Sequence, residues 1–272
     1  MQGPETPVRV AILPIGREIL TGRVQDTNTA FLASRLFEIG VRVARVCSVD
    51  DEQPAIVREL RRCRSDGARV ILTTGGLGPT PDDLTLAAVA RAVNRPLERN
   101  PVALEHVRRR YEELHEAGRL LQPGLTPDRE KMAYLPRGAE VLPNSVGTAP
   151  GALVRWGRVR IFCLPGVPAE MQPMAEASVF PRLIPASGPV VRRRTLSLGV
   201  CDESTLAAVI RRLAPDHPGV HMKPEPKGYG ANREMRVHLE CEGSPDEVEQ
   251  RLDRSAQALQ EAVNTFVTRR KD

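Results

Sequence analysis

Three short apolar runs alternate with three longer segments of helical periodicity in the first 94 residues of the chain. The apolar runs are rich in β-branched residues, as buried strands are, and they lie at residues 8–16, 41–49 and 68–76. The segments with helical spacing lie at residues 26–40, 51–67 and 82–94. Strands that alternate with helices of this length form right-handed βαβ units. We therefore predict an α/β fold with a doubly wound parallel sheet that helices cover on both faces.

The rest of the chain predicts a hairpin and then a change of architecture. Two β runs separated by residues 156–158 indicate the hairpin, and a helix is expected at 168–183. Residues 181–189 have the Pro- and Gly-rich composition of a linker. Beyond them, strand and helix patterns indicate a small α+β module. We therefore predict two domains, at residues 1–184 and 190–268.

The composition indicates a folded protein without membrane contact. Of the 272 residues, 41% are hydrophobic and 27% are charged, which excludes disorder as the main state. No stretch approaches the roughly 20 apolar residues that cross a bilayer, and the N-terminus lacks the pattern of a secretion signal. The five cysteines are scattered without a CxxC pair, which argues against disulfides and zinc. We expect a reduced, cytoplasmic protein.

The charge balance narrows the class of partner. The net charge of +5 suits a phosphorylated small substrate or weak nucleic-acid contact. Aromatic residues are only 3% of the chain, which counts against nucleic acid as a partner because single-strand binders stack bases on aromatic rings. The run Arg108–Arg110 lies in a predicted helix at 101–117, and four glutamates accompany it at helical spacing. We interpret this run as a solvated helix face.

The strongest local signal is TTGGLGPTPDDLT at residues 73–85. Its glycines are Gly75, Gly76 and Gly78. Glycine lets backbone N–H groups approach an anion closely, and a helix predicted to begin near Asp82 adds a positive dipole. Asp82 and Asp83 beside such a site favour a divalent cation that faces a phosphate, because hard cations prefer carboxylate oxygens. The competing interpretation is that one aspartate only caps the helix.

Two further turns follow the other predicted strands and carry carboxylates. Residues 15–22 follow the first strand and include Gly16 and Glu18, with Asp26 and Asn28 close behind. Residues 50–52, which are all acidic, follow the second strand. Because the carboxyl ends of neighbouring strands open onto one crevice, we expect these turns to converge with the glycine-rich turn. For Asp51 and Glu52, the preference of acidic residues for a first helical turn is an equally good explanation.

Two more segments have the composition of a site, NSVGTAPGA at 144–152 and LPGVPAEM at 164–171. The need of a turn for Gly and Pro explains either segment alone. Five such turns in one α/β domain predict a ligand site. The chain contains no G-x-S-x-G elbow, P-loop or H-E-x-x-H motif, and its five histidines are isolated, so other catalytic arrangements are disfavoured.

Taken together, IGREILTGRVQDTN, TGGLGPTPDDLT, NSVGTAPG and LPGVPAEM resemble the CinA family (competence/damage-inducible protein A) in sequence and in order along the chain. The first domain of that family is similar to the molybdopterin-binding MogA and MoaB proteins, and the resemblance covers residues 8–184. GVCDESTLA at 199–207 and the C-terminal module resemble the smaller KH-like domain of the family. The resemblance implies a three-layer α/β domain, a KH-like module and a homodimer.

The resemblance also implies an activity. The first domain of the family is associated with metal-dependent hydrolysis of ADP-ribose to AMP and ribose 5-phosphate, in the recycling of pyridine-nucleotide by-products. The implied cofactor is a divalent metal (Mg, Mn or Co) and the implied partner is a nucleotide substrate. Because the chain ends at Asp272, before the deamidase domain of longer family members, we expect no deamidase activity.

The resemblance assigns roles to individual residues. By motif position, Asp83 and Asp51 are catalytic carboxylates that also hold the metal together with Asp82, and Lys131 is a catalytic charge partner. The phosphate- or nucleotide-binding set comprises Gly16, Glu18, Asp26, Asn28, Gly75, Gly76, Gly78, Thr80, Gly147, Thr148 and Gly166. The chain departs from the family pattern at Arg17, where many relatives have an acidic or small polar residue. It also departs at Met132, where the family has Gln.

Three alternatives remain open at this point. The same domain and aspartates suit a pterin-binding or nucleotidyl-transferring protein of molybdenum cofactor synthesis that does not hydrolyse its ligand. The KH-like module suits RNA binding, although residues 190–272 contain Gly228-Tyr229-Gly230 and no GXXG loop. The departure at Arg17 and the missing deamidase domain suit a non-catalytic remnant.

Overall fold

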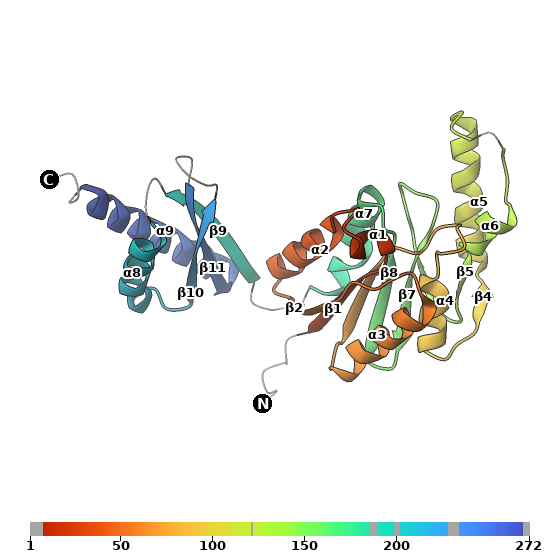
Figure 1. Ribbon diagram of the computed structural model, residues 1–272, viewed down its shortest axis with the longest axis horizontal. Coiled ribbons are helices and arrows are strands. Elements are labelled where there is room, and N and C mark those ends of the chain that lie inside the picture. The colour runs from red at the N-terminus through yellow and green to blue at the C-terminus, as the bar shows by residue number, and fades with distance from the viewer. Residues whose placement is uncertain (1–7, 121, 185–189, 199–201, 228–233, 269–272) are drawn as a thin grey trace. The chain divides into compact units, whose positions relative to one another are not determined.

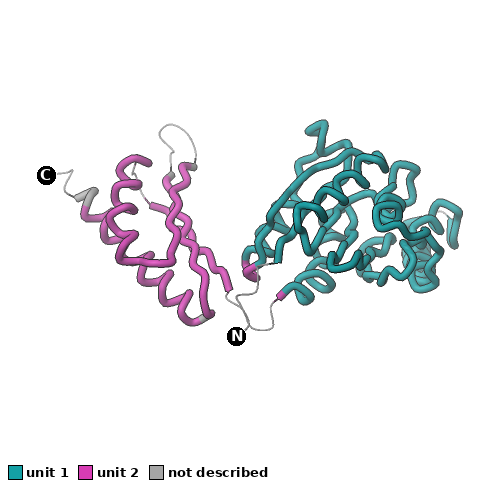
Figure 2. The backbone as a smooth tube through the Cα atoms, turned by 90° about the horizontal axis from the view of Figure 1, so that it is seen from below, with its two compact units in different colours: residues 1–37, 41–183 teal, residues 38–40, 184–272 magenta. Residues whose placement is uncertain are grey.

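The computed structural model of the chain describes residues 8–120, 122–184, 190–198, 202–227 and 234–268. Two compact units are present, residues 1–37 with 41–183 and residues 38–40 with 184–272 (Figure 2). Part of the predicted linker, the start of the GVCDESTLA segment and Gly228-Tyr229-Gly230 lie outside the described residues. None of the described helices has the length and apolar character that a membrane crossing requires.

A mixed six-stranded sheet forms the centre of the first unit, in the order β2-β1-β3-β8-β7-β6 (Figure 1). The strands are β1 (Arg9–Pro14), β2 (Arg42–Val46), β3 (Val70–Thr74), β6 (Glu140–Leu142), β7 (Gly151–Trp156) and β8 (Val159–Leu164). Strands β2, β1, β3 and β8 pair in parallel, whereas β7 pairs in antiparallel fashion with both of its neighbours, β8 and β6. The predicted parallel sheet and the predicted hairpin therefore both exist, as two halves of one sheet.

Helices cover both faces of this sheet. They are α1 (Arg17–Leu20), α2 (Thr27–Glu38), α3 (Gln53–Ser65), α4 (Thr85–Ala92) and α7 (Pro168–Ser178), followed by the short 3₁₀ turn η1 (Phe180–Arg182). Ala11 and Leu13 of β1 belong to one buried cluster with Ile56 and Leu60 of α3. Because side chains alternate along a strand, the equally buried Ile12 faces the other side, where α2 and α7 lie (Figure 1). The predicted doubly wound arrangement is confirmed.

An arm built from residues 95–137 extends from one end of the sheet (Figure 1). It contains α5 (Pro101–Glu116), α6 (Pro127–Lys131) and an antiparallel pair of short strands, β4 (Leu97–Arg99) and β5 (Tyr134–Pro136). The helix predicted at 101–117 is confirmed, and Asn100 caps it by accepting hydrogen bonds from the amides of Val102 and Ala103. The sequence did not predict α6 or the strand pair.

The second unit is a small α+β module, as predicted. Its antiparallel sheet has the order β10-β11-β9, and two helices pack on it. Its elements are β9 (Val190–Leu198), α8 (Glu203–Leu213), the 3₁₀ turn η2 (Ala214–Asp216), β10 (Val220–Lys227), β11 (Glu234–Gly243) and α9 (Pro245–Thr268). The buried cluster of this unit includes Leu206 of α8, Leu239 of β11 and Leu252 of α9. The arginine run in β9 is paired with acidic residues: Arg193 contacts Glu240, and Arg194 contacts Asp253.

Candidate functional site

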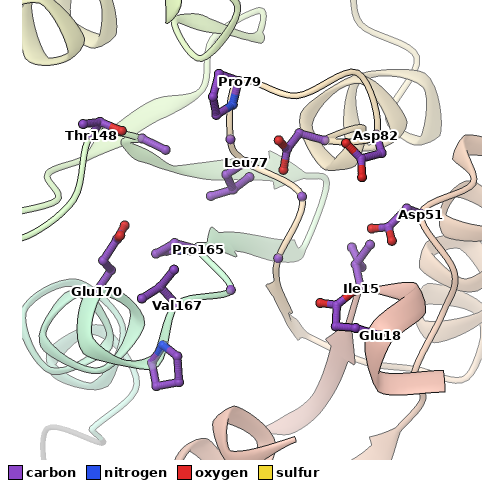
Figure 3. A pocket seen from close by; sticks show the side chains of 17 residues that line it. Ile15, Glu18, Asp51, Leu77, Pro79, Asp82, Thr148, Pro165, Val167 and Glu170 are labelled. Atoms are coloured by element: carbon purple, nitrogen blue, oxygen red, sulfur yellow. The ribbon is translucent and has the colours of Figure 1, made fainter. Parts of the chain in front are cut away.

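A cleft of ≈ 570 Å³ opens at the carboxyl ends of β1, β2, β3 and β8 (Figure 3). It is lined by Ile15, Glu18, Asp51, Gly75, Gly76, Leu77, Gly78, Pro79, Asp82, Asp83, Thr148, Ala149, Pro165, Gly166, Val167, Pro168 and Glu170. All five turns that the sequence singled out contribute to this lining. The three turns that were expected to converge therefore do so, for the topological reason that parallel strands end at one edge.

The cleft has two walls of different character (Figure 3). We call the side formed by Glu18, Asp51, Asp82 and Asp83 the acidic wall. We call the side formed by residues 148–149 before β7 and residues 165–170 after β8 the β7–β8 wall. The glycine loop, residues 75–78, runs between them.

The glycine loop presents unused amide groups to the cleft. The backbone at Gly75 and Gly76 has φ values of 100° and 68°, which glycine adopts without strain. The N–H of Gly75 donates to the carbonyl of Leu164 at 3.0 Å. The N–H groups of Gly76, Leu77 and Gly78 donate to no acceptor in the part of the chain that the structure describes. Three consecutive amides are thus free to meet an anion, whereas the Gly75 amide, which the sequence grouped with them, is already used.

Helix α4 begins at Thr85, three residues after the position predicted from the sequence. Leu84 precedes its first turn, and no side chain caps it. Asp83 instead accepts hydrogen bonds from the amide and the hydroxyl of Thr80, at 2.8 and 2.7 Å, and Asp82 contacts the same hydroxyl. The interpretation that one of these aspartates caps the helix is therefore wrong. Their bonds to Thr80 close a turn ahead of the helix and delay its start.

Asp51 is fixed by the backbone of the first turn. The amide of Arg17 donates to Asp51 Oδ2 at 2.8 Å. Burial, aided by the charges of Glu18, Asp50 and Asp82, raises the pKa of Asp51 above its ordinary value. Helix α3 begins at Gln53, so Asp51 and Glu52 precede its first turn, and neither belongs to it.

Arg17 does not line the cleft. Its guanidinium pairs with Asp50 at 3.1 Å, and the hydrogen bond and charge of this pair lower the pKa of the Asp50 carboxyl. Arg17 therefore neutralises Asp50, the neighbour of the cleft carboxylate Asp51.

Lys131 lies behind the acidic wall. Its ammonium donates to the carbonyl of Thr80, and it is absent from the cleft lining. The pKa of Asp82 is lowered, mainly by the hydrogen bond from Thr80 and also by the charge of Lys131. The adjacent Met132 is only 1% exposed and packs in the main buried cluster, which explains why an apolar residue stands there.

The β7–β8 wall is held by a buried asparagine that the sequence analysis did not single out. Asn144 is 1% exposed. Its Nδ2 donates to the carbonyl of Ala149 at 2.9 Å and to Glu170 Oε2 at 2.8 Å. Its Oδ1 accepts from the amides of Val146 and Gly147 at 3.1 and 2.7 Å. Asn144 thus shapes the loop before β7 and joins it to α7.

Arg110 corrects the expectation of a fully solvated helix face on α5. Arg108 and Arg109 pair with glutamates along the exposed helix, as expected. The Arg110 side chain is only 17% exposed, and it donates to the carbonyls of Val146 and Gly147. Arg110 therefore turns away from the solvated face of α5 to bind carbonyls of a loop that is distant in the sequence. The pattern of residues around Arg110 does not predict this contact.

The other predicted site residues support the lining from behind. Asp26 accepts from the amide of Thr29 at 2.9 Å at the start of α2, and Asn28 donates to the carbonyl of Gly166 at 2.7 Å. Gly16, Thr80 and Gly147 are also outside the lining, although each is next to a residue that belongs to it. Nine of the predicted residues line the cleft: Glu18, Asp51, Gly75, Gly76, Gly78, Asp82, Asp83, Thr148 and Gly166.

The donor set of the acidic wall fits a cation that shares its ligands with a bound phosphate. Among the described residues, no group of three or more His, Cys, Asp or Glu is arranged to hold a metal ion by itself. Magnesium sites commonly use only one or two carboxylates and complete their coordination with water and substrate phosphates. Asp51 and Asp82 approach the cleft from neighbouring turns and suit such a site (Figure 3).

These features define a doubly wound α/β domain with a ligand cleft at the carboxyl edge of its sheet. Residues 11–184 match the family model described as "Probable molybdopterin binding domain", and the chain belongs to this family. The α/β fold predicted for residues 1–184 is therefore that of a molybdopterin-binding domain family.

Relatives from archaea extend the match to nearly the whole chain. A protein of Thermococcus kodakarensis is 39% identical over 251 residues, which are 92% of this chain and 98% of the relative. A protein of Aeropyrum pernix is 46% identical over 222 residues, 81% of this chain and 80% of the relative. A crystal structure described as "the protein CinA with unknown function from Thermoplasma acidophilum" is 33% identical, with a TM-score of 0.56. The match covers 63% of this chain and 95% of that one.

Proposed function

We propose that the cleft binds a phosphorylated pterin or nucleotide, a class of ligand that includes molybdopterin. The observation that carries this proposal is the row of three unused amides, Gly76 to Gly78, between the two walls of the cleft. Backbone N–H groups of this kind bind phosphate oxygens. The family description, which names a probable molybdopterin binding domain, supports the same class of ligand.

A divalent cation is part of this proposal because of the charge of the cleft. Five carboxylates line it, and no Lys or Arg is among the described lining residues. An anionic ligand would be repelled unless a cation intervened. Asp51, Asp82 and Asp83 are the residues that would hold magnesium, manganese or cobalt. When bound, such a cation supplies positive charge to the phosphate and lowers the pKa of a water molecule.

We further propose that the chain is a CinA-type protein whose second unit is the KH-like module and which forms a homodimer. The four sequence motifs and the match to the Thermoplasma acidophilum structure support the first part of this proposal. A light-scattering mass of the purified chain tests the homodimer directly: twice 29.9 kDa supports it and a monomer mass contradicts it.

Calorimetric titration tests the binding function. We expect at least one of the ligands GDP, ADP and ADP-ribose to bind when magnesium or manganese is present. A chelator that removes the metal should abolish this binding. Asp83→Asn keeps an oxygen acceptor for Thr80 but removes the charge, so it should weaken binding by about tenfold or more. Asp128→Asn, at an exposed position on α6, is the matched control and should bind as the wild type does. Equal binding by the two variants would contradict the assigned role of Asp83.

Hydrolysis of ADP-ribose is the second candidate function. Three aspartates lie on one wall of the cleft: Asp51, Asp82 and Asp83. The binding of an anion alone does not need so many carboxylates, and their number favours hydrolysis. In this reaction, water is added across the pyrophosphate bond to give AMP and ribose 5-phosphate. Release of AMP that both a chelator and Asp83→Asn abolish would support a hydrolase. Binding without AMP release by the folded protein would leave the binding function and exclude hydrolysis of this substrate.

A further inference from the structure

Glu170 is the only charged side chain among the residues of the β7–β8 wall that line the cleft. The other lining residues of this wall are neutral and mostly apolar: Thr148, Ala149, Pro165, Gly166, Val167 and Pro168. Figure 3 shows Glu170 across the cleft from Asp51 and Asp82. Its carboxylate is thus separated from the acidic wall and needs an explanation of its own.

Two features fix the position of this carboxylate. Asn144, itself buried, donates to Glu170 Oε2 at 2.8 Å. Gly147 lies directly against the carboxyl group, so that a Cβ at position 147 would overlap it, with Oε1 only 2.6 Å away. The loop before β7 therefore carries both the residue that orients Glu170 and the glycine that leaves room for it.

Glu170 Oε1 accepts no hydrogen bond from the described residues, and Oε2 can accept a second hydrogen bond beside the one from Asn144. Among the described residues, Asn144 is the only side chain that donates a hydrogen bond to Glu170, and Glu170 forms no ion pair with Lys, Arg or His. A carboxylate only accepts hydrogen bonds, so a ligand that meets it must present N–H or O–H donors. The preference of acidic residues for a first helical turn explains why Glu170 is tolerated at the start of α7, but not why a buried asparagine directs it toward the cleft.

Heterocycles differ in the donors that they offer to a carboxylate. Guanine and pterin both contain an aminopyrimidinone edge, in which a ring N–H and an exocyclic amine point the same way. Adenine offers an amine beside a ring nitrogen that accepts. Two parallel donors match a carboxylate, whereas the lone pair of an accepting nitrogen is repelled by it.

We propose that Glu170, oriented by Asn144, is a specificity residue that accepts the paired N–H groups of an aminopyrimidinone ring. The apolar residues Pro165 and Val167 lie beside the ring, and the phosphate end of the ligand lies at residues 76–78. This inference rests on the proposed binding function and narrows its ligand to the guanine or pterin class. Because ADP-ribose carries adenine, the inference stands against hydrolysis of ADP-ribose, the second candidate function.

Titration with a matched set of diphosphates tests the inference. At fixed magnesium, we expect GDP and hydroxymethylpterin diphosphate to bind about 10- to 100-fold tighter than ADP. IDP lacks the exocyclic amine and keeps the ring N–H, so it should fall between GDP and ADP. Whichever of GDP and the pterin diphosphate binds more tightly identifies the source of the ring.

Glu170→Gln tests the residue itself. The glutamine oxygen can accept from Asn144, which leaves an N–H donor facing the donors of the ligand, so the preference for GDP over ADP should disappear, with GDP bound more weakly and ADP no more weakly than by the wild type. Glu176→Gln is the matched control, because Glu176 lies on the same helix and pairs with Arg35 at 2.7 Å, away from the cleft lining. Circular dichroism melts of both variants establish that they are folded.

The outcomes separate the two levels of the proposal. If every diphosphate binds in a metal-dependent manner with no preference for a base, or if ADP binds best, the role of Glu170 is overturned and the binding function stands. An unchanged preference in Glu170→Gln also overturns that role. If no diphosphate binds to the folded wild type, the binding function fails and this inference fails with it.

Discussion

The two walls of the cleft are stabilised in different ways. On the acidic wall, Asp83 is held by its sequence neighbour Thr80 and Asp51 by the backbone amide of Arg17, and both contacts are exposed to solvent. On the β7–β8 wall, the buried Asn144 joins residues that are up to 26 positions apart. Local, solvated contacts contribute little to stability, whereas satisfied buried networks contribute much. The comparison teaches that the acidic wall gathers charge on exposed contacts, whereas a buried network sets the shape of the β7–β8 wall.

The largest effect is expected from Asn144→Ala. This change removes four hydrogen bonds and leaves buried acceptors and donors unpaired, which should lower the free energy of unfolding by about 3 kcal/mol. Urea unfolding followed by circular dichroism measures the loss. Asn264→Ala, on the exposed surface of α9, is the control and should change stability by less than about 0.5 kcal/mol. A loss for Asn144→Ala as small as that of the control would show that the β7–β8 wall is not held by this network.

A pair of glycine substitutions compares the walls directly. A Cβ at position 147 would overlap the Glu170 carboxylate, which Asn144 holds, so Gly147→Ala should cost about 2 kcal/mol. A Cβ at position 78 would meet Asp83 Oδ2 at 2.7 Å, but that half-buried side chain can turn toward solvent, so Gly78→Ala should cost less than about 1 kcal/mol.

For Gly78→Ala, we expect a large loss of ligand affinity beside a small loss of stability. Because displacement of Asp83 disturbs the acidic wall, this variant should lose metal-dependent binding while it remains nearly as stable as the wild type. Thermal melts of Gly147→Ala and Gly78→Ala measure their stability, and titrations of the same samples measure their metal-dependent affinity for the ligand. Equal stability losses in the two alanine variants would remove the distinction between the walls.

The smallest effect is expected from Asp51→Asn, and its sign is opposite. Because the pKa of Asp51 is raised in the folded chain, its ionised form costs stability, and this cost grows as the pH rises above the ordinary value of 3.8 through the raised pKa. Asp51→Asn should therefore be slightly more stable than the wild type at pH 7, by less than about 0.5 kcal/mol. The gain should vanish as the pH falls to 3.8. Melting temperatures across this pH range measure it, and a loss of stability at pH 7 would contradict the pKa assignment.

The sequence predicted the parallel half of the fold and the composition of the acidic wall because both depend on short-range patterns. β-Branched runs locate β1, β2 and β3, and the carboxylates that matter come directly after them. Asp51 and Asp83 could be placed in one crevice because parallel strands end at one edge. What failed within this region was the start of α4, since the bonds of Asp82 and Asp83 to Thr80 form a turn that helical periodicity does not reveal.

The β7–β8 wall was less predictable because its contacts join distant segments. In the sequence, Asn144 is one polar residue among several in a turn-like segment. Its role becomes visible only in the structure, where the fold places Glu170 beside it. Arg110 has glutamates at helical spacing, and only the fold shows that it also reaches the carbonyls of Val146 and Gly147. Met132 similarly reads as a departure from a motif until its burial explains it.

The reversal of strand direction at β7 has a consequence for how such clefts diversify. For the parallel strands, the segment that follows each strand lies at the cleft edge of the sheet. Because β7 runs in the opposite direction, the segment at this edge is the one that precedes β7, residues 143–150. This segment is attached to the sheet on one side of the glycine loop, apart from the acidic turns. Exchange of this one stretch between relatives would change how Asn144 orients Glu170 and would leave the acidic wall and the glycine loop the same. The hairpin thus makes the shape of the β7–β8 wall separately variable from the acidic wall.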